Sequence, residues 1–307
     1  MSERAPIDRG DVETERRNPR TLDLSRRDVH GVLQALGDED EVAVRAVAAA
    51  REELARLVEA IEPGFVAGGR LVYVGAGTSG RLGVLDASEA PPTFGVERGR
   101  VVGLIAGGDA ALRESSESAE DELDGARERL ESLGLGDRDA VVGVAASGST
   151  PYVLGALVHA KRLAPRCVTG LVCCVPRDVP PGCDHVVRAV TGPEALTGST
   201  RLKAGTATKL VLNAISTTLM VRAGRTYGNL MVDVRATNAK LRDRAARIVA
   251  TVVPCDRARA FELLERAGGE AKVAVVVGRL GLDAAGARAR LADVGGRLDA
   301  LLDEVRP

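Results

Sequence analysis

The feature that most restricts the fold of this chain is a repeated pattern: a short apolar run leads through a glycine- and hydroxyl-rich loop into a helical segment. The first run, residues 71–74, continues into Gly75-Ala76-Gly77-Thr78-Ser79-Gly80. Two similar loops follow, Ser147-Gly148-Ser149-Thr150-Pro151 and Thr197-Gly198-Ser199-Thr200-Arg201. A buried strand, a tight turn and a helix produce this pattern in α/β proteins.

Five apolar runs alternate with helical segments over most of the chain. The expected strands are residues 71–74, 101–106, 140–145, 168–175 and 185–190. This alternation predicts a three-layer αβα sandwich with a mainly parallel sheet. Ligands of such sheets bind beyond the carboxyl ends of the strands, so we expect the three hydroxyl-rich loops to gather at one site.

We expect three parts along the chain. Residues 1–62 form a charged arm followed by helices, with breaks expected at Asp38 and at Pro63, and residues 63–253 form the ligand-binding sheet domain. Within that domain, residues 109–133 read as one acidic helix. Residues 254–307 form a small module of three helices, because amphipathic segments continue there without strands.

Composition excludes several classes of function. The 307 residues carry a net charge of −1 with both signs mixed, so the chain has no broad basic surface for nucleic acid or an anionic membrane. No apolar run is long enough to cross a membrane and the N-terminus is charged, so we expect a cytoplasmic protein. Aromatic residues make up only 2% of the chain, which argues against stacking as the main means of recognition.

Cysteine and histidine also give little sign of chemistry. The five cysteines form no CxxC pair, and Cys173 and Cys174 lie in an apolar run, so we expect buried thiols. The three histidines show no metal-binding spacing. We therefore expect no metal site.

The first loop suits an anion, most plausibly a phosphate. Its glycines allow a sharp turn, and Thr78 and Ser79 add hydroxyl donors to the N–H groups of the helix start. The glycine spacing resembles a dinucleotide fingerprint, but no acidic residue ends a second strand, and Arg81 stands where a Walker loop has lysine. A generic tight turn stays open for this loop alone, whereas three converging loops favour a phosphorylated small molecule.

Four motifs resemble those of the N-acetylmuramic acid 6-phosphate etherases, which have the sugar isomerase (SIS) fold. The motifs are GAGTSGRLGVLDASEAPPTFG, VVGVAASGSTPYV, TGSTRLKAGTATKLVLN and GNLMVDVRATNAKL, and the resemblance extends over roughly residues 14–241. The chain is also similar to the glucokinase regulatory proteins, which share the fold and bind sugar phosphates without catalysis.

The resemblance implies that N-acetylmuramate 6-phosphate and water become N-acetylglucosamine 6-phosphate and D-lactate. The implied route is elimination of lactate followed by addition of water, with two carboxylates and with neither a metal nor a cofactor. In the family these carboxylates map onto Glu89 in the DASE segment and Glu120 in the acidic segment. We assign Glu120 to take the C2 proton and Glu89 to protonate the lactate oxygen, with the roles exchangeable.

The residues alone support these two roles unequally. Glu89 precedes Ala90-Pro91-Pro92, so it is expected near a helix C-terminus, where the helix dipole favours a protonated carboxyl; a solvated residue at the helix end is the alternative. Glu120 lies among acidic residues spaced three or four apart, for which a solvated helix face is the alternative.

Substrate binding is expected from hydroxyl groups and helix N-termini. The candidates are Ser147, Ser149 and Thr150, with Thr78 and Ser79 at the same mouth and Ser199, Thr200 and Lys203 as further candidates. Lys203 could instead be a surface lysine. The chain has Val175-Pro176 where the family carries Asn-Pro, so we assign no ligand contact to that loop.

Two other functions remain open on this fold. A sugar phosphate sensor without catalysis would use the same loops but leave Glu89 without a role. An aldose–ketose isomerase would remove the same C2 proton but release no lactate.

Three open loops cannot easily enclose a small amino sugar phosphate, so we also expect a homodimer.

Overall fold

The computed structural model describes residues 13–114, 118–234 and 238–303, so the first twelve residues of the expected arm lie outside it. The chain divides into two compact units. The first contains the described residues up to Ala87 together with Val101–Ile215. The second contains Ser88–Arg100 and the described residues from Ser216 onward, so this division falls earlier than the boundary expected at residue 254.

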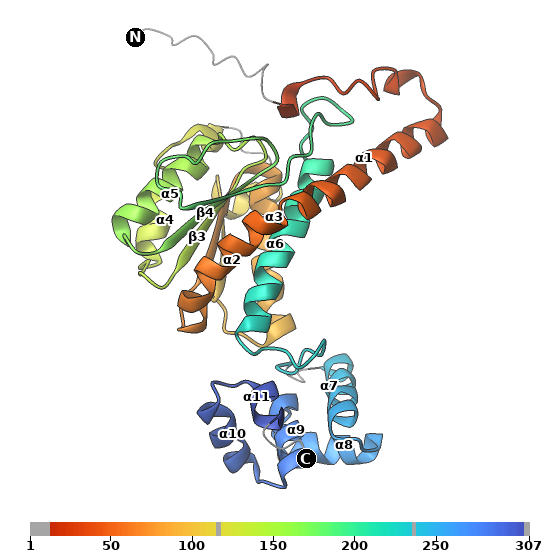
Figure 1. The fold of residues 1–307 in the computed structure, drawn as a ribbon, viewed down its shortest axis with the longest axis vertical. Helices are drawn as coiled ribbons and strands as arrows, with labels where there is room; N and C mark the ends of the chain where they lie inside the picture. Colours follow the sequence, from red (N-terminus) through yellow and green to blue (C-terminus); the bar gives the residue numbers. More distant parts are fainter. Residues whose placement is uncertain (1–12, 115–117, 235–237, 304–307) are drawn as a thin grey trace. The chain divides into compact units, whose positions relative to one another are not determined.

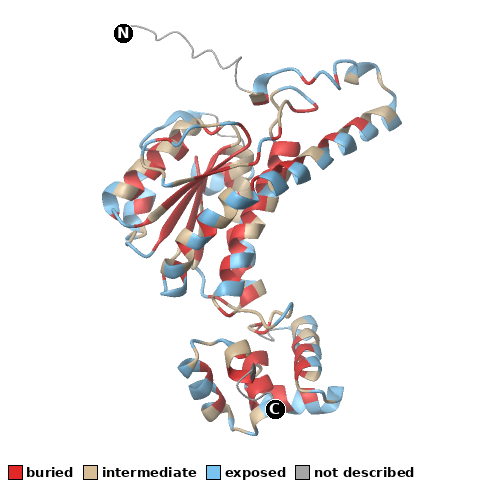
Figure 2. Ribbon diagram, viewed as in Figure 1, coloured by how far each residue is buried: buried red, intermediate tan, exposed pale blue. Residues whose placement is uncertain are grey.

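The first unit contains a five-stranded parallel sheet, as the alternation of strands and helices predicts. The strands are β1 (Leu71–Gly75), β2 (Val101–Ile105), β3 (Ala140–Val144), β4 (Val168–Cys173) and β5 (His185–Arg188). Their order is β2-β1-β3-β4-β5, and every neighbouring pair is parallel. The residues of β1 and β3 are buried throughout, because helices cover both faces of the sheet (Figure 2).

Helices form a layer on each side of this sheet, which confirms the α/β sandwich (Figure 1). One layer contains α4 (Arg127–Ser132) and α5 (Pro151–Leu163); the other contains α2 (Arg51–Val66), α3 (Gly77–Phe94) and α6 (Lys203–Arg222). Alternate residues of β1 face the two layers. Val72 and Val74 join the cluster formed with α4 and α5, whereas the Tyr73 hydroxyl donates to the Leu212 carbonyl of α6 at 3.3 Å.

The N-terminal helices differ from the expected boundaries. Helix α1 (Val29–Ala49) begins at Asp28, whose carboxylate accepts a hydrogen bond from the Gly31 N–H, but it continues through Asp38. The Asp38 carboxylate accepts from the Gln34 side chain on the helix surface, so it does not cap a new helix. The break falls at Ala50, and α2 extends past Pro63 to Val66.

The acidic segment does not form the single helix expected over residues 109–133. Its described part contains the short 3-10 helices η3 (Gly108–Leu112) and η4 (Ser118–Asp121), followed by α4. Gly107 and Gly108 both adopt positive φ, which starts the segment with a turn. Glu120 therefore lies on η4 and not on the face of a long helix.

The second unit is helical and has its own core. It contains α7 (Ala239–Val252), α8 (Arg257–Arg266), α9 (Ala271–Leu280), α10 (Ala284–Asp293) and α11 (Leu298–Asp303). Four of these helices, in place of the expected three, follow Pro254 in the described part of the chain, because Gly295 and Gly296 adopt positive φ and separate α10 from α11. Val273 to Val277 of α9 are all buried in the core. Throughout the described residues, the helices are too short or too polar to cross a bilayer.

Candidate active site at the sheet switch point

The sheet order places its switch point between β1 and β3. The chain leaves β1 toward β2 on one side and leaves β3 toward β4 on the other, and this divergence opens a crevice at the carboxyl ends of the two strands. Gly75 pairs with Val144 in the register, so both strands end at the same level. The segments that follow them therefore lie side by side, with Thr78 and Ser79 in the first turn of α3 and Ser147 to Thr150 in the loop after β3.

The glycines after β1 bring strand and helix into close contact. A Cβ at Gly75 would lie 2.7 Å from the Gly80 nitrogen, and a Cβ at Gly80 would lie 2.7 Å from the Gly75 oxygen. Gly77 has a φ of +51°, a conformation that favours glycine. A Cβ at Gly77 would also lie 3.0 Å from Oε1 of Glu120. The glycine spacing thus serves backbone packing and leaves room for the Glu120 carboxylate.

Glu120 is half-buried and lines a hollow with both central loops. We call this the Glu120 hollow; it is lined by Thr14, Glu15, Ala76, Gly77, Thr78, Ser79, Glu120, Ala145, Ala146, Ser147, Thr150 and Thr200. Five of the eight residues expected to bind substrate are in this set. The Glu120 carboxylate therefore shares this hollow with hydroxyl-bearing residues from four separate segments of the chain.

The loop after β3 is organised by its serines. Ser147 Oγ lies 2.9 Å from Ser149 Oγ and also accepts a hydrogen bond from the Ser149 N–H. Gly148 turns the chain with a φ of +66°. Thr150 is the N-cap of α5, and Pro151 occupies its first turn. Hydroxyl groups thus lie directly at the N-terminus of α5, where the helix dipole favours an anion.

A second hollow adjoins the first and shares Ser147 with it. We call it the Arg177 hollow; it is lined by Glu13, Arg16, Ser147, Ser149, Val175, Pro176 and Arg177. The loop after β4 therefore does reach the site, although the change to Val175-Pro176 led us to assign it no contact. A Cβ at Gly148 would lie 2.8 Å from Cδ of Arg177. The adjacency of β3 and β4 in a parallel sheet is the signal that could have predicted this placement.

The third hydroxyl-rich loop, residues 197–201, supplies fewer residues to the two hollows than expected. Thr200 lines the Glu120 hollow, whereas Ser199 lines neither of the two hollows as described. Lys203 is only 1% exposed and forms an ion pair with the buried Glu39, so the surface alternative for this lysine is wrong. Its ammonium group is already occupied by a carboxylate, and Arg20 reaches the same Glu39 at 2.7 Å.

The N-terminus of α6 already binds an internal carboxyl group. Oε1 of the fully buried Glu194 accepts from the Ala204 N–H at 3.0 Å, and Oε2 accepts from the Lys203 N–H at 3.2 Å. Burial raises the pKa of the Glu194 carboxyl above its ordinary value. This helix end is therefore not available to a ligand phosphate in the way that the start of α5 is.

Glu89, the second carboxylate that the resemblance assigns to catalysis, lies on helix α3. It is exposed, and it belongs to the part of α3 that groups with the second unit. Helix α3 does not end before the prolines as expected; it includes Pro91 and Pro92 and continues to Phe94, where Gly95 follows with a positive φ. Glu89 is not among the described residues that line either hollow.

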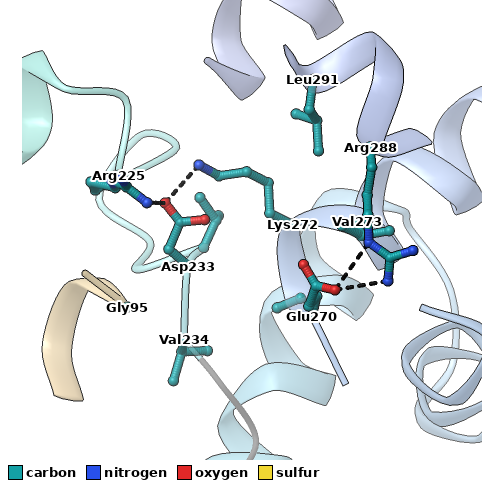
Figure 3. Close-up of a pocket in the computed structure, with 11 residues that line it drawn as sticks. Gly95, Arg225, Asp233, Val234, Glu270, Lys272, Val273, Arg288 and Leu291 are labelled. Carbon is teal, nitrogen blue, oxygen red and sulfur yellow. Dashed lines mark hydrogen bonds and ion pairs between the residues drawn. The ribbon is translucent and has the colours of Figure 1, made fainter. Parts of the chain in front are cut away.

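The second unit has a pocket of its own around Lys272 (Figure 3). The ammonium group donates to Oδ2 of Asp233 at 2.7 Å and to the carbonyls of Gly224 and Gly296, both at 2.9 Å. Burial lowers the pKa of Lys272. Arg288 is paired with Glu270 at 2.8 Å. Because three acceptors bind the Lys272 ammonium group, this lysine connects the segments that contain Gly224, Asp233 and Gly296. It does not present a free charge to a ligand.

The cysteines behave as the sequence indicates. Cys173 and Cys174 are buried, and burial raises their pKa values to about 11 and about 12. No three His, Cys, Asp or Glu side chains converge as a metal cluster within the described residues.

Comparison with known proteins gives consistent matches. Residues 52–161 match the family described as the glucokinase regulatory protein N-terminal SIS domain. Over 292 residues the chain is 51% identical to the N-acetylmuramic acid 6-phosphate etherase of Cutibacterium acnes, covering 95% of each protein. It is 51% identical to the Rubrobacter xylanophilus etherase over 97% of this chain and 98% of that protein. For the Cronobacter sakazakii etherase the identity is 49%, over 95% and 98%. At this identity and coverage, the chain belongs to the N-acetylmuramic acid 6-phosphate etherase family.

Proposed function

We propose that this protein cleaves the D-lactyl ether of N-acetylmuramic acid 6-phosphate, giving N-acetylglucosamine 6-phosphate and D-lactate. Relatives with this named activity match nearly the whole chain at about 50% identity. The structural observation that carries the proposal is the position of Glu120. Its carboxylate lies over Gly77 in a hollow whose remaining polar groups are mainly hydroxyls at the start of two helices.

The proposed phosphate position is the loop after β3. Ser147, Ser149 and Thr150 offer hydroxyl groups at the N-terminus of α5, where an anion is stabilised. Thr78, Ser79 and Thr200 line the adjoining Glu120 hollow and are proposed to contact the sugar or its phosphate. Ser199 and Lys203 are proposed to support this site from outside, since neither lines the hollows and Lys203 is paired with Glu39.

The elimination half of the proposed chemistry needs two proton transfers, and the addition of water reverses both. In the open-chain sugar the C2 hydrogen is acidified by the neighbouring aldehyde, and Glu120 takes this proton. The C3–O bond then breaks, its electron pair leaves with the lactate oxygen, and Glu89 supplies the proton to that oxygen. Water adds at C3 of the unsaturated sugar and C2 is reprotonated, so the net reaction consumes one water. Each transfer is of a kind that contributes on the order of 10²–10⁴ in rate.

We also propose that the active form is a homodimer. Both hollows are open in the single chain, and the second carboxylate lines neither of them. An isologous dimer could bring Glu89 of one copy to Glu120 of the other. This arrangement would account for an exposed Glu89 at a position that the family motif assigns to catalysis.

One experiment separates this function from its alternatives. The purified protein is incubated with N-acetylmuramate 6-phosphate, and D-lactate and the sugar product are quantified. An etherase releases equal amounts of D-lactate and N-acetylglucosamine 6-phosphate. A sensor, which the match to the glucokinase regulatory domain would also fit, binds the sugar phosphate and releases nothing. An isomerase converts a sugar phosphate but yields no lactate.

A further inference from the structure

The N-terminal segment of residues 13–16 forms part of the wall of both hollows. Thr14 and Glu15 line the Glu120 hollow, while Glu13 and Arg16 line the Arg177 hollow. The sequence pattern alone predicts only a charged arm for this segment. The structure instead places it against the loops after β1, β3 and β4.

Hydrogen bonds to the segment between β5 and α6 hold this wall in place. The Thr14 carbonyl accepts from the Gly198 N–H at 3.2 Å, and the Asn18 side chain donates to the Pro193 carbonyl at 3.1 Å. The Thr21 hydroxyl donates to the Ala195 carbonyl at 2.8 Å. The position of Thr14 is thus set by its backbone and by its neighbours, without any use of its own hydroxyl group.

The Thr14 hydroxyl is the unusual group in this wall. Thr14 is 0% exposed, and its Oγ1 has no hydrogen-bond partner among the described residues. Glu13 Oε2 is also buried without a partner there. A buried hydroxyl that makes no hydrogen bond destabilises the free protein, so such groups are rare in native structures. Thr14 carries this penalty at the edge of the hollow that holds Glu120.

We propose that Thr14 is a further substrate-binding residue, whose hydroxyl forms a hydrogen bond with an oxygen of the bound amino sugar phosphate. The inference rests on the proposed function for the identity of that ligand. It adds the N-terminal wall to a site otherwise built from the loops of the sheet and Glu120. Among the described residues the Thr14 hydroxyl has no hydrogen-bond partner, and in this proposal the ligand supplies one.

The test compares Thr14→Val, which removes the hydroxyl and keeps the shape, with Thr14→Ser, which keeps the hydroxyl. Binding of N-acetylglucosamine 6-phosphate is measured by calorimetry, and kcat and KM are measured with N-acetylmuramate 6-phosphate. Thr14→Val should weaken binding and raise KM by about tenfold or more, with Thr14→Ser within about threefold of wild type. The thermal midpoint of ligand-free Thr14→Val should equal or exceed that of wild type, because an unpaired hydroxyl has been removed.

Thr191→Val is the matched control. Thr191 is also buried with an unpaired Oγ1 in the described structure, but it lines neither hollow. Its replacement should leave binding unchanged. Wild-type affinity in Thr14→Val, or an equal loss in Thr191→Val, would overturn the inference; if Thr14→Val does not fold, Thr14→Ala is measured in the same way.

The two proposals fail differently. Lactate release by wild type with no effect of Thr14→Val contradicts the binding role and leaves the etherase. Sugar phosphate binding that Thr14→Val weakens, with no lactate from wild type, contradicts the etherase and leaves the binding role.

Discussion

Gly77 links backbone conformation to the proposed chemistry within a single residue. Its positive φ starts α3 directly after the strand, and its missing side chain leaves space for the Glu120 carboxylate. Any larger residue must strain the backbone and press on the far end of the Glu120 side chain. The glycine pattern that looked like a dinucleotide fingerprint is thus accounted for by close packing at Gly75 and Gly80 and by carboxylate placement at Gly77.

Replacing Gly77 by alanine should therefore affect catalysis more than folding. The left-handed conformation should cost about 1–2 kcal/mol of stability, and the shifted carboxylate should lower kcat by at least about tenfold. Steady-state kinetics and urea unfolding measure the two effects. Gly37→Ala is the control, since a Cβ there meets nothing within 4 Å and its helix should gain about 0.5–1 kcal/mol with kcat unchanged. A Gly77→Ala enzyme with wild-type kcat would contradict this account of Glu120.

Sequence spacing could predict the loop residues of the site, but not its walls. Thr78, Ser147 and Thr150 follow strands of one parallel sheet, and that fact alone brings them to one edge. Thr14 reaches the hollow only because distant backbone groups, such as the Gly198 N–H, hold its segment there. Lys203 was expected at the ligand or on the surface, and only the packing of α1 shows that Glu39 binds it.

At the scale of elements, Asp139 joins the starts of the two central strands. Its carboxylate accepts from the backbone N–H of Arg70 at 2.7 Å, from the Arg70 guanidinium, and from the Gly136 N–H at 2.8 Å. Burial would raise the pKa of Asp139, but the Arg70 and Gly136 hydrogen bonds outweigh it and hold the pKa below the ordinary 3.8. The carboxylate thereby helps to fix the register on which the site depends.

The lowered pKa gives this contact a defined pH dependence. Because the folded protein favours the ionised carboxylate, its contribution is fully present above about pH 4 and is lost as the pH falls through the lowered pKa. Asp139→Asn should lose about 2–3 kcal/mol of unfolding free energy at pH 7, and the difference from wild type should shrink below pH 4. Urea unfolding across this range measures it. Asp137→Asn, at an exposed pair with Arg166, should show no comparable loss; a pH-independent difference for Asp139→Asn would contradict the assignment.

Strand positions could be read from the sequence more reliably than helix boundaries. Continuous apolar runs bounded by glycine leave few alternatives to buried parallel strands. The acidic segment that carries Glu120 has residues suited to a helix, yet its turns follow from positive-φ glycines and from packing under α5. Helix α3 retains Pro91 and Pro92 in its last turn, although each proline lacks the N–H that would donate to the carbonyl four residues earlier. In the GNLMVDVRATN motif, Val232 and Val234 pack in the core of the second unit, while residues 235–237 lie outside the described structure.

The two carboxylates proposed for catalysis belong to different units of the molecule. Glu120 lies in a hollow of the first unit, and Glu89 lies on the part of α3 that groups with the second. The homodimer proposal accounts for this by taking the two residues from different copies.

Mixed dimers test that arrangement. Glu89→Gln and Glu120→Gln chains carrying different tags are produced together, and the mixed dimer is isolated. If each site takes Glu89 from one copy and Glu120 from the other, the mixed dimer keeps one intact site and should show about half of wild-type activity. If both residues come from one chain, no site is intact and activity stays absent. Light scattering of wild type checks the dimer itself.

The reaction of N-acetylmuramate 6-phosphate in heavy water tests both the elimination route and the proposed role of Glu120. Wild-type protein should release D-lactate and give N-acetylglucosamine 6-phosphate with deuterium at C2, since the C2 proton that Glu120 is proposed to remove is replaced from solvent. Glu120→Gln should lower the rate of both lactate release and C2 exchange by about 10²–10⁴, whereas Glu122→Gln, a neighbouring exposed acid outside the Glu120 hollow, should not. Lactate released without deuterium at C2, or wild-type rates from Glu120→Gln, would contradict the elimination mechanism and the role of Glu120 in it.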